Sequence, residues 1–326
     1  MRILIAFFLV GALAVAGWAA WAFYTPVTPP GNQFVLLHSG YSTRRIGIEL
    51  KKAGVIQSVL AFRLWRRLHP ALSLKAGEYL FERTASVPEI YARIARGDVY
   101  FHEVTIPEGY TMFDIAKAME DAGLGPAEEF LKIAQTRTDL IADLAPEAKS
   151  LEGYLFPNTY QFTRAQSPEE MMGAMIHQFR QVAQQIGLNS DVHRVVTMAA
   201  IVEKETAAAD ERPIVASVYY NRLAHRMALD ADPSVIYAHL LAGNYSGSLH
   251  HADLAVDSPY NTYRFAGLPP GPIANPGQGA LAAAMHPAET QFFYFVSDGN
   301  GHHRFAHDLT EHNLNVAAYR HALGMR

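Results

Sequence analysis

The segment Ile201–Thr206, Ile-Val-Glu-Lys-Glu-Thr, places two carboxylates in an otherwise apolar stretch that predicts a buried helix. Successive helical residues point about 100° apart, so Glu203 and Glu205 cannot face the same substrate. Glu205 lies in the last turn before the break at residues 210–213, where the helix dipole and desolvation both disfavour an ionised carboxylate. A carboxyl that stays protonated near neutral pH suits a general acid, and protonation of a glycosidic oxygen is a typical task for it.

A structural interpretation of the same residues is also open. Both helix faces are apolar, so periodicity does not choose between the two glutamates. They can instead form a solvated helix end in which one Glu pairs with Arg212 or Arg222.

Glycosidases that retain or invert configuration use a second carboxylate. Sequence spacing does not show which acid approaches Glu205 among the candidates Glu152, Glu211, Asp230 and Asp232.

A zinc hydrolase is the natural rival enzyme class, because the chain has 15 histidines, including the adjacent pairs at 250–251 and 302–303. However, it has no His-Glu-x-x-His motif, and adjacent histidines on a strand point to opposite sides. It has no cysteine, which excludes disulfides, cysteine nucleophiles and thiolate metal sites. We therefore expect no metal and no cofactor. Solvated loops are expected for most histidines, while His303 is a candidate cleft residue.

The composition is that of a globular protein, with half of the 326 residues hydrophobic and 18% charged. A net charge of −4 gives no reason to expect nucleic acid as a partner. A local basic patch is possible around Arg63, Arg66 and Arg67.

The run Gly267–Gly277, rich in proline and glycine, predicts a constrained loop that either shapes a site or forms a rigid corner.

The N-terminus carries 22 residues without a charge, Ile3–Tyr24, which is long enough to span a bilayer as a helix. Arg2 precedes the run, so the positive-inside tendency places the N-terminus in the cytoplasm. Aromatic residues gather at its far end, as in a membrane-interface belt. A cleaved signal peptide is the alternative, with small-x-small sites within residues 12–16. We favour an uncleaved anchor, because the bulky aromatics follow these sites without a break. In either case the rest of the chain is exported.

Periodicity and capping residues predict small mixed units first and a mainly helical region later. After a Pro/Gly linker at 25–32, we expect strands at 34–38, 75–82 and 99–106 and helices at 43–53, 59–68, 86–96 and 111–122. Further along we expect helices at 168–186, 192–208, 210–223, 234–241, 280–285 and 309–323, with a strand at 292–297 and a second strand after it.

Several motifs together make the chain resemble a known family. They are the segments 152–160, 198–206, 211–212, 216–223, 232–237, 260–263, 267–271 and 294–299 with His303. In this order they resemble the bacterial endolytic murein transglycosylases, the membrane-anchored YceG-like (MltG) family. Residues 33–150 match more loosely, and their order of strands and helices resembles a LysM-like peptidoglycan-binding part.

The resemblance implies an α+β architecture with an N-terminal transmembrane helix, small LysM-like units and a mainly helical, lysozyme-like catalytic domain with a small β part. The implied domains are an anchor at 1–24, a linker at 25–32, a positioning region at 33–150 and a catalytic domain at 151–326. It also implies that Glu205 is the catalytic acid, with Thr206 in the place of a serine found in other lytic transglycosylases.

Roles for neighbouring residues follow as hypotheses. Residues that orient Glu205 or hold N-acetyl groups are expected to be Tyr220, Asn221, Asn261 and Tyr263. Residues that line the glycan cleft are expected to be Glu152 and Tyr154. Glu211 and Asp232 are expected to brace the fold, because both stand at predicted helix starts.

The implied reaction cleaves the MurNAc–GlcNAc bond within nascent peptidoglycan strands. The muramic 6-hydroxyl attacks its own C1, so a 1,6-anhydro end forms and no second acid is needed. The implied partners are glycan strands, peptidoglycan synthases and the membrane. The implied location is the bacterial inner membrane, with a cytoplasmic N-terminus and a periplasmic catalytic domain. The rival hypotheses are a hydrolytic muramidase that uses Glu211 or Asp232, and a non-catalytic peptidoglycan-binding scaffold.

Overall fold

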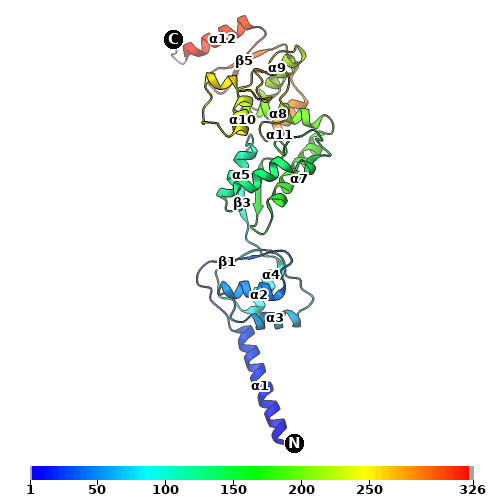
Figure 1. The fold of residues 1–326 in the computed structure, drawn as a ribbon, viewed down its shortest axis with the longest axis vertical. Helices are drawn as coiled ribbons and strands as arrows, with labels where there is room; N and C mark the ends of the chain where they lie inside the picture. Colours follow the sequence, from blue (N-terminus) through cyan, green and yellow to red (C-terminus); the bar gives the residue numbers. More distant parts are fainter. Residues whose placement is uncertain (1, 323–326) are drawn as a thin grey trace. The chain divides into compact units, whose positions relative to one another are not determined.

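The chain, described here over residues 2–322 in a computed structural model, divides into two compact units. The first unit comprises residues 1–103 and 161–167, and the second comprises 104–160 and 168–326. Strands β3 (His102–Ile106) and β4 (Asn158–Phe162) pair with each other, and the chain passes between the units within these two strands. The course of the chain can be followed by colour in Figure 1.

The first unit is built from α1 (Arg2–Tyr24), β1 (Gln33–Leu37), α2 (Thr43–Lys52), α3 (Val59–Leu68), β2 (Gly77–Phe81) and α4 (Val87–Arg96). Strands β1 and β2 are antiparallel, with Val35 opposite Tyr79. Helix α2 begins at Ser42, whose hydroxyl accepts the Arg45 N–H. Helix α4 ends at Gly97, where a φ of 80° favours glycine.

Helix α1 is long and apolar enough to cross a membrane, with a span over Ile3–Tyr24 of mean hydropathy 2.4. Only its far end packs on the rest of the unit, where Ala22 and Phe23 are buried with Ala61 of α3.

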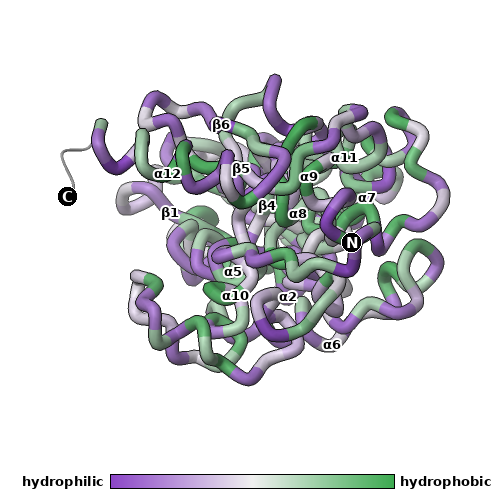
Figure 2. Tube along the Cα trace, turned by 90° about the horizontal axis from the view of Figure 1, so that it is seen from above, coloured by the Kyte–Doolittle hydropathy of each residue, from purple (hydrophilic) through white to green (hydrophobic). Residues whose placement is uncertain are grey.

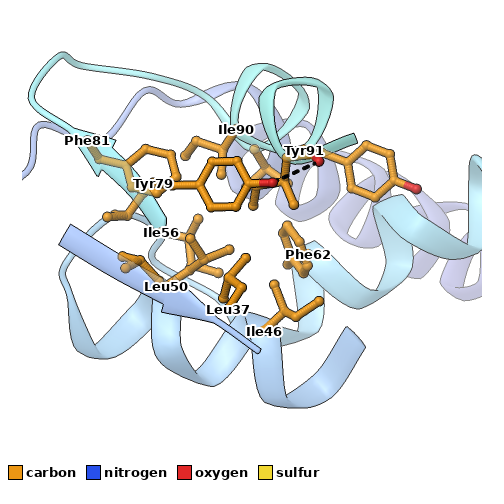
Figure 3. Packing of buried hydrophobic residues seen from close by; sticks show 13 residues of the cluster. Leu37, Ile46, Leu50, Ile56, Phe62, Tyr79, Phe81, Ile90 and Tyr91 are labelled. Carbon is orange, nitrogen blue, oxygen red and sulfur yellow. Dashed lines mark hydrogen bonds between the residues drawn. The ribbon is translucent and has the colours of Figure 1, made fainter. Parts of the chain in front are cut away.

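The core of the first unit lies between the β1–β2 pair and helices α2, α3 and α4. The labelled side chains in Figure 3 come from all five elements and from the turn after α2. Tyr79 is fully buried there, and its hydroxyl donates to the backbone carbonyl of Ile94 at 3.3 Å. Because its hydroxyl is hydrogen-bonded, this large ring fills the core without leaving a buried polar oxygen unpaired.

A buried carboxylate ties the returning segment 161–167 to the first unit. Glu78 of β2 is 1% exposed and forms an ion pair with Arg164. It also lies 2.9 Å from Nε2 of His102. Burial alone would raise the pKa of Glu78, but the hydrogen bonds and charges of Arg164 and His102 outweigh it and lower that pKa.

The second unit is mainly helical. Its elements are α5 (Met112–Asp121), α6 (Ala127–Thr136), the 3₁₀ turn η1 (Thr138–Ile141), α7 (Pro168–Ile186), α8 (Val192–Glu205), α9 (Arg212–Ala224), α10 (Asp232–Ala242), the 3₁₀ turn η2 (His251–Ala255), α11 (Gln278–Met285), β5 (Tyr294–Ser297), β6 (His303–Ala306) and α12 (Leu309–Ala322). Helix α8 contacts α9, α10 and α11, and its residues 196–202 are all buried. Figure 2 colours the chain by hydropathy, with the hydrophobic segments in green.

Most predicted elements are confirmed, as is the mixed α+β class. The expected end of the last helix at Leu323 lies outside the described residues, and α12 is described to Ala322. Helix α6, η1 and strand β4 were not predicted. Helix α8 ends at Glu205 rather than at residue 208, because Thr206 turns to extended backbone. The compact units divide after residues 103, 160 and 167, and the domain boundary expected at 150 stays a prediction.

Candidate active site

The carboxyl of Glu205 stands at the C-terminal end of α8 and opens into a pocket of about 370 Å³. Thr206 ends the helix with φ −139° and ψ 132°, and its hydroxyl accepts the Ala208 N–H at 3.1 Å. The pocket is formed by α8, α9, α12, β5 and the loops around α10. Its lining residues are Glu205, Tyr219, Arg222, Leu229, Asp230, Asp232, Tyr263, Tyr294, Phe295, Leu309 and His312.

Tyr219 positions the Glu205 carboxyl, because its hydroxyl donates a hydrogen bond to Oε1 at 2.8 Å. Burial raises the pKa of Glu205 to about 7, against the Tyr219 hydrogen bond, which lowers it. The charge of Asp232 adds to the rise, and the charge of Arg222 opposes it. A substantial fraction of Glu205 is therefore protonated at neutral pH.

Two further carboxylates line the pocket, Asp230, which pairs with Arg222, and Asp232, in the first turn of α10. The Tyr263 hydroxyl donates to Asp232 Oδ1 at 2.6 Å. The loop that carries Tyr263 is fixed by buried Asn261, whose amide donates to the carbonyls of Leu254 and Val256. Asn261 Oδ1 also accepts the Tyr263 N–H at 3.1 Å. Asn261 thus supports the pocket wall, while Tyr263 itself reaches the pocket.

Arg222 holds the wall that faces Glu205. Its guanidinium donates to the backbone carbonyls of Phe293, Ala228 and Leu229, and to Asp230 Oδ2 at 3.0 Å. It also lies 5.1 Å from the ring centroid of Tyr294. These contacts join α9, the loop before α10 and β5 into one wall.

Glu203 and Lys204, in contrast, are engaged in packing between elements. Glu203 accepts the Gly277 N–H at 3.0 Å and forms an ion pair with Arg212 at 3.2 Å. Lys204 Nζ donates to the Gly109 carbonyl at 3.2 Å. The two glutamates of the motif therefore have different surroundings, and the expected pairing of one glutamate with Arg212 is made by Glu203.

Glu152 is enclosed elsewhere in the second unit and is not among the residues that line the Glu205 pocket. Both of its oxygens accept the N–H of Met112, at the start of α5, and Oε1 also accepts the amide of Asn275 at 2.7 Å. Asn275 Oδ1 in turn accepts the N–H groups of Gly153 and Leu155. Asn275 comes from the Pro/Gly-rich run, which acts here as a rigid corner that fastens residues 152–155.

The remaining predicted site residues also lie outside the pocket lining. Tyr154 is fully buried, and its hydroxyl lies 3.0 Å from Nδ1 of His193. The Tyr220 hydroxyl donates to the Ala284 carbonyl, and the Asn221 amide donates to the carbonyls of Thr290 and Phe292. Buried Thr206 serves the helix end. These polar groups make internal hydrogen bonds, and their roles in glycan binding stay predictions.

Glu211 is another internal brace. It occupies the cap position of α9 and accepts both the backbone N–H and the Nδ1–H of His303, at 2.8 and 2.7 Å. His303 therefore fastens β6 to the start of α9. Within residues 2–322, no group of three or more His, Asp and Glu side chains is arranged to hold a metal ion.

The sequence left Tyr219 open between a residue that stacks on sugar rings and a core residue, and it did not assign Arg222 and Tyr294 to the site. A signal existed for Tyr219 and Arg222, because residues three apart share a helix face. Tyr294 and His312 come from elements that no local pattern connects to α8.

Comparisons with known proteins agree on one family. The sequence pattern that defines the YceG-like family matches residues 35–318. A Bacillus subtilis protein named endolytic murein transglycosylase is 35% identical over 296 residues, covering 84% of this chain and 81% of its own length. A Streptococcus pneumoniae serotype 2 protein of the same name is 29% identical, with coverage of 90% and 60%. The crystal structure of a putative yceG-like protein from Listeria monocytogenes matches with a TM-score of 0.57 and 31% identity, covering 87% of this chain and 98% of that one.

Proposed function

The chain belongs to the YceG-like family, and we propose that Glu205 is the catalytic acid with which it cleaves glycan strands of peptidoglycan. The enzyme is an endolytic murein transglycosylase, the activity for which its Bacillus and Streptococcus relatives are named. Two observations support the role of Glu205. Its carboxyl opens into a pocket, and the pKa of that carboxyl is raised to about 7. An acid of this pKa donates a proton efficiently near neutral pH.

In the proposed reaction, protonated Glu205 donates its proton to the glycosidic oxygen between MurNAc C1 and GlcNAc. The C1–O bond breaks, and positive charge develops at C1. The resulting Glu205 carboxylate then accepts the proton of the muramic 6-hydroxyl as its oxygen bonds to C1. Glu205 ends protonated, the product carries a 1,6-anhydro ring, and no water is consumed.

The other pocket residues have roles that fit this sequence of steps. The Tyr219 hydroxyl holds Oε1 of Glu205, and Glu205 lines the pocket. Burial is the main cause of the raised Glu205 pKa, and the negative charge of Asp232 adds to it and so favours the protonated form. The same charge favours the positive charge that develops at C1. Tyr263 fixes the direction of Asp232 through the 2.6 Å hydrogen bond.

The membrane helix suits a substrate that is made at the membrane. We propose that α1 stays uncleaved, with the N-terminus in the cytoplasm and the residues that follow α1 in the periplasm. Cleavage of nascent strands there would end their elongation, beside the synthases that make them. We also propose that the first unit is LysM-like and positions the glycan, and that the second is lysozyme-like.

One observation favours a second candidate, a hydrolytic muramidase. Asp232 and Glu205 line the same pocket, and two carboxylates are what a hydrolase needs to activate water. In that case Asp232 is the second carboxylate, and the products carry reducing ends rather than anhydro ends.

Mass spectrometry of released fragments tests the proposal. The full chain in detergent micelles and its Glu205→Gln variant are incubated with purified peptidoglycan. We expect fragments one water lighter than reducing-end sugars from the wild type, and none from the variant. Reducing-end fragments would support the muramidase. Equal products from both proteins would remove Glu205 from the mechanism, and no products from either would favour a scaffold.

A further inference from the structure

Positive charge gathers in the part of the first unit that follows α1 in sequence. Residues 25–75 contain eight Lys and Arg residues and one acidic residue, Glu49, although the whole chain has a net charge of −4. Glu49 is already paired with Arg45 and Lys52 of α2. The three arginines of α3, at 63, 66 and 67, have no ion-pair partner among the described residues.

The exposed face of α3 combines these arginines with leucines. Residues 60, 63 and 67 follow the three- and four-residue spacing of one helix face. Leu64, on the same side, is partly buried against Ala22 and Phe23 of α1. On this side Leu60 is 51% exposed, and Leu68 at the end of the helix is 66% exposed. The opposite face, with Ala61 and Phe62, is buried in the unit. A basic helix with exposed leucines is the pattern of a segment that lies in a membrane interface.

The contacts of α1 place this face at the membrane. The apolar span ends at Tyr24, and the last turn before it packs on α3. The rings of Phe23 and Tyr24 lie 5.4 and 6.0 Å from the ring of Trp65 in α3, both edge to face. Aromatic residues at the end of a span mark the level of the headgroups. Because α3 is fastened to the end of the span, it is held at that level.

We propose that the exposed face of α3, defined by Leu60, Arg63, Arg66, Arg67 and Leu68, binds the anionic phospholipid surface of the membrane that α1 spans. The arginines bind lipid phosphates, and the leucines enter the headgroup region. Each arginine near an anionic surface is expected to strengthen docking about fivefold. Docking would fix the height and tilt of the first unit above the bilayer. The inference rests on the membrane anchor of the proposed function.

The test uses single cysteines, because the chain has none of its own. The full chain with Leu68→Cys carries an environment-sensitive fluorophore and is placed in phosphatidylcholine nanodiscs with or without phosphatidylglycerol. Brominated lipids then report contact with the bilayer through quenching. Two controls are Leu13→Cys within α1, and Leu314→Cys on α12, which is 69% exposed and so matches Leu68.

We expect strong quenching at position 13, quenching at position 68 that increases at least twofold with phosphatidylglycerol, and none at position 314. Replacing Arg63, Arg66 and Arg67 together with glutamine should abolish the increase, with thermal unfolding unchanged as the check on folding. No quenching at position 13 would reject the anchor itself. Quenching at 13 without quenching at 68, or quenching at 68 that ignores lipid charge, would overturn the inference while the anchor stands.

Discussion

Glu205 and Glu152 are two glutamates of the second unit whose pKa values burial raises, to about 7 and about 8 respectively. Glu152 is enclosed by donors, because the Met112 N–H and the Asn275 amide both reach it. Glu205 receives its hydrogen bond from the Tyr219 hydroxyl and opens into a pocket. A raised pKa is therefore shared by a structural brace and a candidate acid. Access to a pocket distinguishes the two.

The largest expected effect comes from replacing Glu205 with Gln. Removal of a general acid should lower the rate of glycan cleavage by at least about 100-fold. A similar loss for Glu152→Gln, per folded molecule, would remove the distinction between the two glutamates. The measurement is the rate of anhydro-product release at equal concentrations of folded protein.

The stability of the Glu205→Gln variant sharpens the same comparison. The folded pKa of about 7 exceeds the unperturbed value of 4.5, so the protonated form contributes stability below pH 4.5 that is lost as the pH rises through 7. The Glu205→Gln variant does not lose this stability as the pH rises, because the glutamine amide does not titrate. Relative to wild type, its free energy of unfolding should therefore rise between pH 4.5 and 7, by at most about 3 kcal/mol. Denaturant unfolding at several pH values measures this, and a constant difference would contradict the raised pKa.

Glu152→Ala should lower the stability of the fold and leave the activity of folded molecules almost unchanged, the reverse of what is expected for Glu205→Gln. It leaves the Met112 N–H and the Asn275 amide without a buried acceptor, which is expected to cost about 2–4 kcal/mol of folding free energy. The activity of the molecules that remain folded should stay within about twofold of wild type, because Glu152 does not line the pocket. Unfolding curves and activity per folded molecule separate the two effects. A stable variant with little activity would assign Glu152 to the site.

The position of Glu205 in the last turns of a helix was predictable because its signals are local, although the helix was expected to end at residue 208. The surroundings of Glu152 were not predictable. Met112 and Asn275 are 40 and 123 residues from Glu152, and no periodicity connects such positions. The Pro/Gly-rich run predicted a rigid corner or a site loop, and only the fold shows that it supplies Asn275. Tyr263 shows the same limit, because its approach to Asp232 spans 31 residues of loop and helix.

Asp232→Asn and Tyr219→Phe should move the Glu205 pKa in opposite directions. Loss of the Asp232 charge lowers that pKa, so the ratio of cleavage at pH 8 to cleavage at pH 6 should be about threefold to tenfold lower than in the wild type. Loss of the Tyr219 hydroxyl removes a hydrogen bond that lowers the pKa, so activity should persist to higher pH. Rate profiles from pH 5 to 9 compare the variants. Shifts in the same direction would show that these residues do not act through Glu205.

The pH dependence of kcat/KM for the wild-type chain, measured on soluble glycan strands, tests the central claim most directly. Because kcat/KM reports the free enzyme, an essential protonated Glu205 predicts a constant value at low pH and a tenfold fall per pH unit above about pH 7. A value that instead rises through pH 7, or is already falling near pH 4.5, would contradict an acid kept protonated by its pocket.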